Sequence, residues 1–218
     1  MDIVGLGTPF GLALASGLNA YLPLLAFTLS VRWLHLYQVN PNFAFITSNW
    51  LIAALALLTL LDFVADKIPL LDHSWDAIHT VVRPIAGALV AAAASSNALA
   101  GTPLTAITSD PGSGSVLVAL SAVPVTEIGL LVIPLIGGGL AALSHTTKST
   151  TRFVSTITTA GFLNVGLSLV EDGLVVLIVL LSLFASTIMF ILLVLLILAP
   201  QAIRIWNTRF KRQRGILP

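Results

Sequence analysis

The chemistry-bearing residues of this 218-residue chain crowd into one short stretch, residues 62–83. Asp72 and Asp76 are four residues apart, and His79 and Arg83 follow at spacings of three and four. These spacings place the four side chains on one face of a helix. Carboxylates beside an imidazole could form a hydrated site for a cation or a proton. The alternative is the solvated face of a cytoplasmic amphipathic helix. Asp and His at these spacings are no specific metal signature, so no metal ligand is predicted.

A second cluster lies in the other half of the chain. His145, Lys148 and Arg152 are three and four residues apart and again share one helical face. If the two stripes lie on neighbouring helices, they can pair, and pairing lowers the cost of placing charge in a membrane. The alternatives are an ordinary basic cytoplasmic loop and, because hydroxyls surround the cations, an anion or lipid-phosphate site.

Two asparagines interrupt apolar segments. Asn19 follows Gly17 and precedes Pro23, and Asn164 follows Gly161. Broken membrane helices are tolerated where their freed backbone groups line a cavity, so both asparagines are candidates for a polar pathway. The alternative is hydrogen bonding and close packing between helices.

Further acidic residues flank apolar runs. Asp62 and Asp66 lie at the end of one run, and Asp62 is expected to pair with Lys67 or to join the polar cluster. Glu171 and Asp172 precede the most apolar run and are expected at the outer surface, capping the last helix. The candidate pathway residues are Asn19, Asp66, Asp72, Asp76, His79, Arg83, His145, Lys148, Arg152, Asn164 and Glu171.

The composition requires a membrane around these residues. Hydrophobic residues make up 57 % of the chain and charged residues 9 %, against about 25 % charge in soluble domains. These values exclude an ordinary soluble domain, a disordered chain and a nucleic-acid binder. The absence of cysteine excludes disulfides and thiolate metal sites. Hydrolase, metalloprotease and phosphate-loop motifs are missing, so an enzyme is disfavoured and no cofactor is predicted.

The elements that must position the candidates are membrane helices. A spanning helix needs about 20 mostly apolar residues. The sequence therefore predicts an all-α polytopic bundle of six spans, the third following a polar helical stretch at 72–83. The spans are residues 3–30, 49–65, 85–100, 116–144, 153–170 and 173–199, the last stopped by Pro200.

The basic residues orient these spans. With both termini in the cytoplasm, nine of the ten Lys and Arg residues lie inside, and Arg32 alone lies outside. Five of the nine belong to a tail that would anchor on anionic lipid. Residues 145–152 are then an inner loop.

The spans divide into two halves of three. Residues 1–100 form the first half, 101–115 a Gly/Pro/Ser-rich linker, 116–200 the second half and 201–218 the basic cytoplasmic tail. Halves with three spans each have opposite orientations, the geometry of an inverted repeat. Sequence support is the short match of Gly17-Leu18-Asn19 to Gly161–Asn164, and a match of this length also arises by chance.

The clusters resemble a known family. GLNAYLPLL at 17–25, FVADKIP at 63–69, WDAIHT at 75–80 and Arg83-Pro84 resemble small bacterial membrane proteins catalogued as domain of unknown function four-one-two-six. His145, Lys148, Arg152, Asn164 and residues 168–172 resemble its second-half pattern. Residues 155–162 depart from it, since a more polar phrase with Asn and Pro is expected there. The resemblance implies a bacterial inner-membrane location and no activity.

We expect a small transporter or channel for an ion or small polar solute. The alternatives are a non-catalytic membrane-complex subunit or assembly factor and, third, a lipid-handling protein. The expected partners are the lipid bilayer and such a solute, with no nucleic acid. The oligomeric state is left open, a homo-oligomer included.

Overall fold

A computed structural model describes residues 4–39, 41–67, 69–99, 125–159 and 162–213, and some helical side chains, including those of 69–76, lie outside the description. The described residues form seven α-helices and two short 3-10 helices, with no strand among them, which confirms the all-α prediction. The elements are η1 (Val4–Leu6), α1 (Gly7–Ser16), α2 (Leu22–Arg32), η2 (Pro41–Thr47), α3 (Asn49–Ala65), α4 (Pro69–Leu99), α6 (Val125–Thr159), α7 (Asn164–Phe184) and α8 (Ser186–Gln213).

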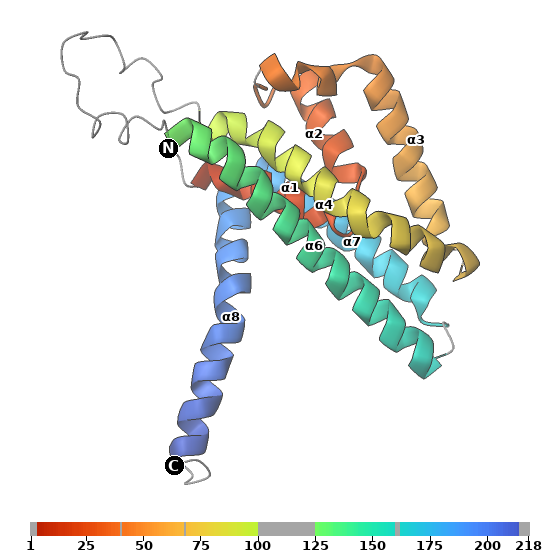
Figure 1. Ribbon diagram of the computed structural model, residues 1–218, viewed down its shortest axis with the longest axis vertical. Helices are drawn as coiled ribbons and strands as arrows, with labels where there is room; N and C mark the ends of the chain where they lie inside the picture. Colours follow the sequence, from red (N-terminus) through yellow and green to blue (C-terminus); the bar gives the residue numbers. More distant parts are fainter. Residues whose placement is uncertain (1–3, 40, 68, 100–124, 160–161, 214–218) are drawn as a thin grey trace, which may run out of the picture.

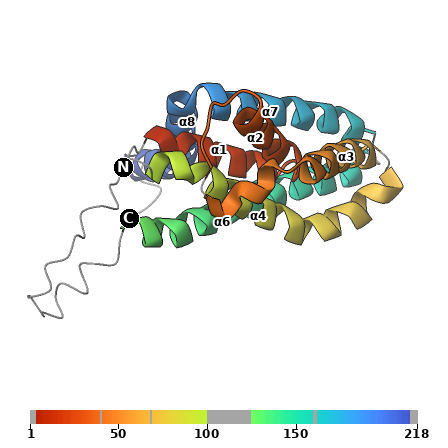
Figure 2. The same ribbon diagram turned by 90° about the horizontal axis from the view of Figure 1, so that it is seen from above.

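The short helix α1 lies at the centre of the bundle. Figure 2 shows it between α7 on one side and α4 with α6 on the other. Most of its residues are buried, and Leu12, Ala13 and Ala15 are fully enclosed. They pack with Val90 of α4 and Val175 of α7 in one apolar core. A helix that is apolar on every side fits such a central position.

Small residues bring α4 and α6 close together. These two helices run side by side in Figure 1. A Cβ added at Gly87 would lie 2.4 Å from the Cβ of Ala141, and one added at Gly137 would lie 2.4 Å from the Cβ of Ala91. The backbones can approach because these positions carry no larger side chain, which is how membrane helices commonly pack.

Residues 3–30 do not form one crossing. The chain enters as α1, turns at residues 17–21 and returns as α2, as the predicted break at Gly17–Asn19 allows. The hydroxyls of Thr8 and Tyr37 are 3.4 Å apart, so the segment between them begins and ends at the same end of the bundle. The single span predicted here is wrong, because an apolar run of this length suits a buried helical hairpin as well as a span.

The second half also departs from the predicted spans. α6 continues through residues 145–152, so the predicted inner loop is helical. The segment predicted as the span 173–199 is interrupted at Ala185, between α7 and α8, and Pro200 lies within α8 rather than ending it. The carbonyls exposed near the interruption are satisfied, since Thr8 donates to Ser182 O at 2.7 Å and Tyr37 to Leu183 O at 2.6 Å. Such partners make a break tolerable in an apolar setting.

Among the described residues, three helical segments are long and apolar enough to cross a membrane: Ala77–Ser95, Asn164–Phe184 and Ser186–Trp206. α3 matches its predicted bounds of 49–65 and is a shorter apolar helix. Figure 1 shows α8 extending away from the other helices. The protein is therefore an integral membrane protein. The predicted linker, 101–115, lies outside the described residues.

Candidate functional site

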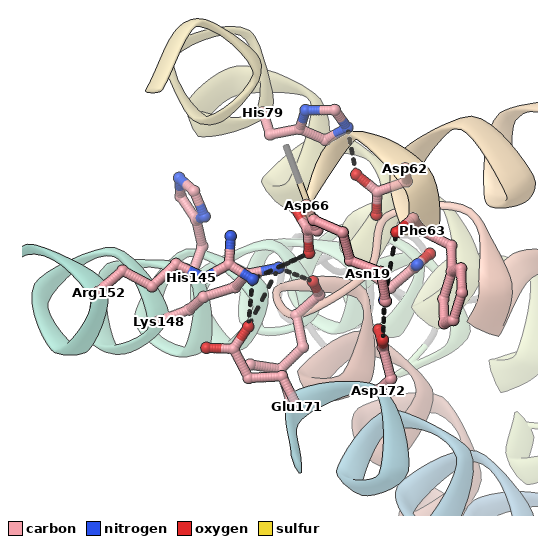
Figure 3. Close-up of polar contacts among 12 residues, drawn as sticks. Asn19, Asp62, Phe63, Asp66, His79, His145, Lys148, Arg152, Glu171 and Asp172 are labelled. Atoms are coloured by element: carbon pink, nitrogen blue, oxygen red, sulfur yellow. Dashed lines mark hydrogen bonds and ion pairs between the residues drawn. The ribbon is translucent and has the colours of Figure 1, made fainter. Parts of the chain in front are cut away.

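The charged residues gather at one end of the bundle, where α3 ends. Figure 3 shows Lys148 and Arg152 of α6 directed toward Asp66, with Glu171 of α7 on their other side. We call this group, with the adjoining pairs described below, the charge network. Its members are Asp62, Asp66, Lys67, His79, Arg83, His145, Lys148, Arg152, Glu171 and Asp172.

Asp66 is the centre of the largest ion cluster. One of its oxygens, Oδ2, lies 2.6 Å from Lys148 Nζ and 3.1 Å from Arg152 Nη2. The same guanidinium nitrogen donates to Glu171 Oε2 at 2.7 Å, and Lys148 lies 3.5 Å from that oxygen. Asp66, Lys148 and Arg152 are all at most 7 % exposed. Two acids and two bases therefore neutralise one another away from solvent.

The turn between α1 and α2 forms part of the same cluster. The carbonyl of Leu18 accepts a bond from Lys148 Nζ at 3.0 Å. Asn19 Oδ1 accepts the backbone N–H groups of Tyr21, which precedes α2, and of Leu22, the first residue of α2. Ser144 of α6 donates to Leu14 O at 2.7 Å. The backbone groups freed by the turn are thus satisfied by side chains, and the carbonyl end of α1, where the helix dipole is negative, faces the Lys148 ammonium.

A second group joins α3, α4 and α6. Asp62 Oδ1 lies 3.5 Å from His79 Nε2 and 3.8 Å from Arg83 Nη2, and all three side chains are fully buried. Arg83 Nη1 lies 2.7 Å from Nδ1 of His145. The two predicted stripes therefore meet through Arg83 and His145.

The Arg83–His145 contact determines the protonation of the imidazole. A guanidinium can only donate, so Nδ1 of His145 must accept and carries no proton. The proton of the neutral ring then lies on Nε2, which is 3.2 Å from Thr80 Oγ1 and can donate to it. A doubly protonated His145 would lose the bond to Arg83.

Lys67 and Asp172 form a more exposed pair at the edge of the network. Their side chains are 2.8 Å apart and about a quarter exposed, at 26 % and 21 %. The Lys67 ammonium also lies 3.3 Å from the ring centre of Phe63, a cation–π contact. The network as a whole contains four acidic and four basic groups and two histidines, so it is neutral when all four carboxyls are ionised and both imidazoles are neutral.

Asp66 lies just beyond the end of α3. Burial would raise the pKa of its carboxyl, but the adjacent Lys148 and Arg152 outweigh burial and lower the pKa below its ordinary value of 3.8. The carboxyl is therefore held ionised, which keeps the two cations of α6 paired.

Most of the sequence-predicted candidates meet here. Asp66, Lys148, Arg152 and Glu171 form one cluster, and His79, Arg83 and His145 form the other. Asn19 caps α2 beside them. Asn164 makes a separate contact, donating from Nδ2 to Thr156 Oγ1 at 2.9 Å. The side chains of Asp72 and Asp76, in the first turns of α4, lie outside the description.

Two expectations about the acidic residues need correction. Glu171 is not on the opposite surface from the 145–152 segment, because it binds Arg152, and no span of about 30 Å fits between them. Within the predicted span 153–170, α6 ends at Thr159 and α7 begins at Asn164, so this segment is not one span. Asp62 joins the polar cluster, where it faces His79 and Arg83, and Lys67 pairs with Asp172 instead. The sequence signal for this role was a lone carboxylate in the apolar run 49–65. In the part of the chain that the structure describes, no group of three His, Asp or Glu side chains could hold a metal ion.

Comparison with known proteins supplies a family and no activity. No match is found among curated proteins or among solved structures. The family described as Domain of unknown function (DUF4126) matches residues 6–109 and 107–207. The two matched stretches cover both the α1–α4 region and the α6–α8 region, and therefore every residue of the charge network. The chain belongs to the DUF4126 family.

Proposed function

We propose that the protein is a small transporter or channel for an ion or small polar solute and that the charge network lies on its pathway. The observation that carries this proposal is the burial of Asp62, His79 and Arg83 beside the cluster around Asp66 in a membrane protein. Isolated charges in such surroundings are costly, so ionisable residues inside membrane bundles commonly mark ion or proton pathways.

The two histidines favour a proton as the ion that moves or that couples movement. Imidazole is the side chain that changes charge most readily near neutral pH. His79 faces the carboxylate of Asp62, and His145 accepts a bond from Arg83. Protonation of His145 would release Arg83, whose other nitrogen already lies 3.8 Å from Asp62. A proton on His145 would therefore favour a shift of the guanidinium toward Asp62.

The broken segment at residues 17–21 supports the same function. Transporters commonly place their ion sites where discontinuous helices meet. Here the turn between α1 and α2 contacts Lys148 directly through the Leu18 carbonyl.

We also propose that this end of the bundle faces the cytoplasm of a bacterial cell, because the basic residues of the network and of the tail then share the inner side. The hairpin of α1 and α2 then places the start of α1 at the opposite end of the bundle from the charge network, so this orientation does not include a cytoplasmic N-terminus. The paired halves of an inverted repeat remain a proposal, supported by the join of the two family matches at 107–109.

The test is flux through purified protein in proteoliposomes. Proton, Na⁺, K⁺ and Cl⁻ movements would be measured separately with internal indicator dyes. The network variants are Asp62→Asn and Asp66→Asn, and the control is Arg204→Gln, an exposed cation of α8. Flux of at least one ion that falls by about tenfold or more in the network variants and persists in the control supports the proposal. Flux equal to that of empty liposomes for all four ions, or flux unaffected in both network variants, contradicts an ion pathway through the network.

A second candidate is a subunit of a membrane complex, favoured by α8. This helix extends away from the bundle and exposes a long series of apolar side chains, among them Ile191, Leu195 and Leu198. Purification from native membranes in mild detergent tests it. A stoichiometric partner that is lost when Leu195 is replaced by Arg would support this candidate, and a chain that purifies alone would contradict it.

A further inference from the structure

We propose that the contact between α6 and α7 contains a file of water molecules that leads from the bundle surface at Asn164 to the Arg152–Glu171 ion pair. The role of this hydrated seam as an access route depends on the proposed function. Its hydration does not, and it can be measured without any flux.

The helix register places polar side chains opposite each other along the seam. α6 and α7 run antiparallel, with Arg152 bound to Glu171 at one level and Thr156 bound to Asn164 nearer the end of α6. Ser155 is three residues after Arg152, and Ser168 is three residues before Glu171. The two bonded pairs therefore bracket both serines, which lie on the same helical faces as these pairs, along the contact between α6 and α7.

The two serines are buried without protein partners. Ser155 is 7 % exposed and Ser168 is fully buried. Neither hydroxyl has a hydrogen-bond partner among the described residues, and the same holds for Asn164 Oδ1 and for Asp66 Oδ1 at the inner end. Buried polar atoms in native proteins are almost always hydrogen-bonded, to protein or to ordered water. Four such atoms in sequence along one route point to a bridging molecule rather than to an isolated defect.

The hydrogen-bonding groups that line the seam suit water. They also suit other molecules that are small, polar and uncharged. Hydroxyls donate and accept, whereas an amide oxygen and a carboxylate oxygen accept. Water can satisfy all of them, since it makes two to four hydrogen bonds. A bare cation is disfavoured because Arg152 and Lys148 lie at the inner end, and an anion is disfavoured because Glu171 and Asp66 lie there too.

Ser182 shows that a buried serine of α7 can be satisfied within the protein. Ser182 lies on the same helix, α7, and is also fully buried. Its hydroxyl donates to Ile178 O at 2.6 Å, and it packs against Gly11 of α1. It therefore matches Ser168 in residue type, helix and burial, and differs in having a protein partner.

Thiol labelling tests the proposal, because the chain has no cysteine of its own. Ser155→Cys, Ser168→Cys and Ser182→Cys would be made singly in the full-length protein and treated with a small water-soluble methanethiosulfonate reagent. Reactivity follows access of water and of the thiolate form, so we expect labelling at 155 and 168 to be at least about tenfold faster than at 182. Labelling at 155 and 168 as slow as at 182, in variants that elute as folded protein, would overturn the proposal.

Two further measurements keep the test decisive. If one serine variant fails to fold, the other decides, because both line the same seam. The double variant Ser155→Cys/Ser168→Cys checks the register, since cysteines on facing positions form a disulfide on mild oxidation only when their Cα atoms are about 4.4–6.8 Å apart. Fast labelling at 155 and 168 without proteoliposome flux would support the hydrated seam and contradict the transport proposal. Flux with labelling as slow as at 182 would support transport and contradict the seam.

Discussion

Arg83 donates a 2.7 Å hydrogen bond to Nδ1 of His145, which ties a permanent cation of α4 to a neutral imidazole of α6. The bond exists only while that nitrogen carries no proton. It joins the two charged stripes of the sequence and makes the position of a buried guanidinium depend on the state of a titratable group.

Replacement of His145 should separate the acceptor function from the imidazole itself. His145→Leu leaves Arg83 without this acceptor and should lower the free energy of unfolding by about 1.5–3 kcal/mol, the usual contribution of a hydrogen bond to a charged group. His145→Gln can present an amide oxygen to Arg83 and should retain most of the stability. Unfolding titrations in detergent measure both, and equal losses in the two variants would contradict the assigned role of Nδ1.

The buried and exposed ion pairs of the network should respond differently to loss of one partner. Lys148→Met leaves Asp66 with less compensation in a buried site and should cost about 3–5 kcal/mol. Lys67→Met breaks a pair that is about a quarter exposed and should cost less than about 1 kcal/mol. Both variants remove one ammonium from the same network, so the difference reports burial.

The double variant Asp66→Asn/Lys148→Met provides the control for this comparison. It removes the carboxylate that Lys148→Met leaves behind and should be less destabilised than the sum of the two single variants. Additive losses would indicate that the two residues act independently, despite their 2.6 Å contact.

Gly17 should tolerate no larger side chain, for a steric reason. Its backbone is in an ordinary helical conformation, with φ −74° and ψ −20°, but an added Cβ would lie 1.8 Å from Ser144 Oγ and 2.1 Å from Ala141 O. Gly17→Ala should therefore push the α1–α2 turn away from α6 and destabilise the protein by about 1–3 kcal/mol.

Gly166 of α7 is the matched control for Gly17, because an added Cβ there meets nothing within 4 Å. Gly166→Ala should be neutral or stabilising by up to about 1 kcal/mol, since alanine favours a helix. Thermal unfolding in detergent compares the two, and equal effects would argue against close packing at the turn.

Acid should weaken the cluster around Asp66. The folded pKa of this carboxyl lies below its ordinary value of 3.8, so its contribution to stability is present above that value and is lost as the pH falls through the folded pKa. The stability difference between wild type and Asp66→Asn should therefore be largest near neutral pH and shrink below about pH 4. A difference that grows on acidification would contradict the assigned pairing with Lys148 and Arg152.

Sequence patterns predicted the local features of this protein well. The spacing of His79 with Arg83, and of His145 with Arg152, identified faces that do carry the buried contacts. The Gly17–Asn19 break was also visible, because Gly and Asn disfavour a helix interior. The bounds of α3 followed from an apolar run that ends where the charges begin.

The direction in which the chain runs could not be predicted from hydropathy. An apolar run gives the composition of a segment and not its path, so a hairpin and a single span have the same hydropathy. The Thr8–Tyr37 contact is what distinguishes them, because it places the start of α1 beside the segment that follows α2. Residues 145–152 resembled a basic loop because their cations had no visible partners. Glu171, 19 residues beyond Arg152, supplies one of them only because α6 turns back into α7.

The central claim is that the charge network lies on a transport pathway, with a proton as the ion that its histidines favour. Proton uptake into dye-loaded proteoliposomes tests this claim most directly. A K⁺ diffusion potential would drive uptake through wild-type protein, Asp62→Asn and Arg204→Gln. The account predicts uptake above that of empty liposomes in wild type and Arg204→Gln, and uptake lowered by about tenfold or more in Asp62→Asn. Equal uptake in wild type and Asp62→Asn, with both proteins folded, would contradict it.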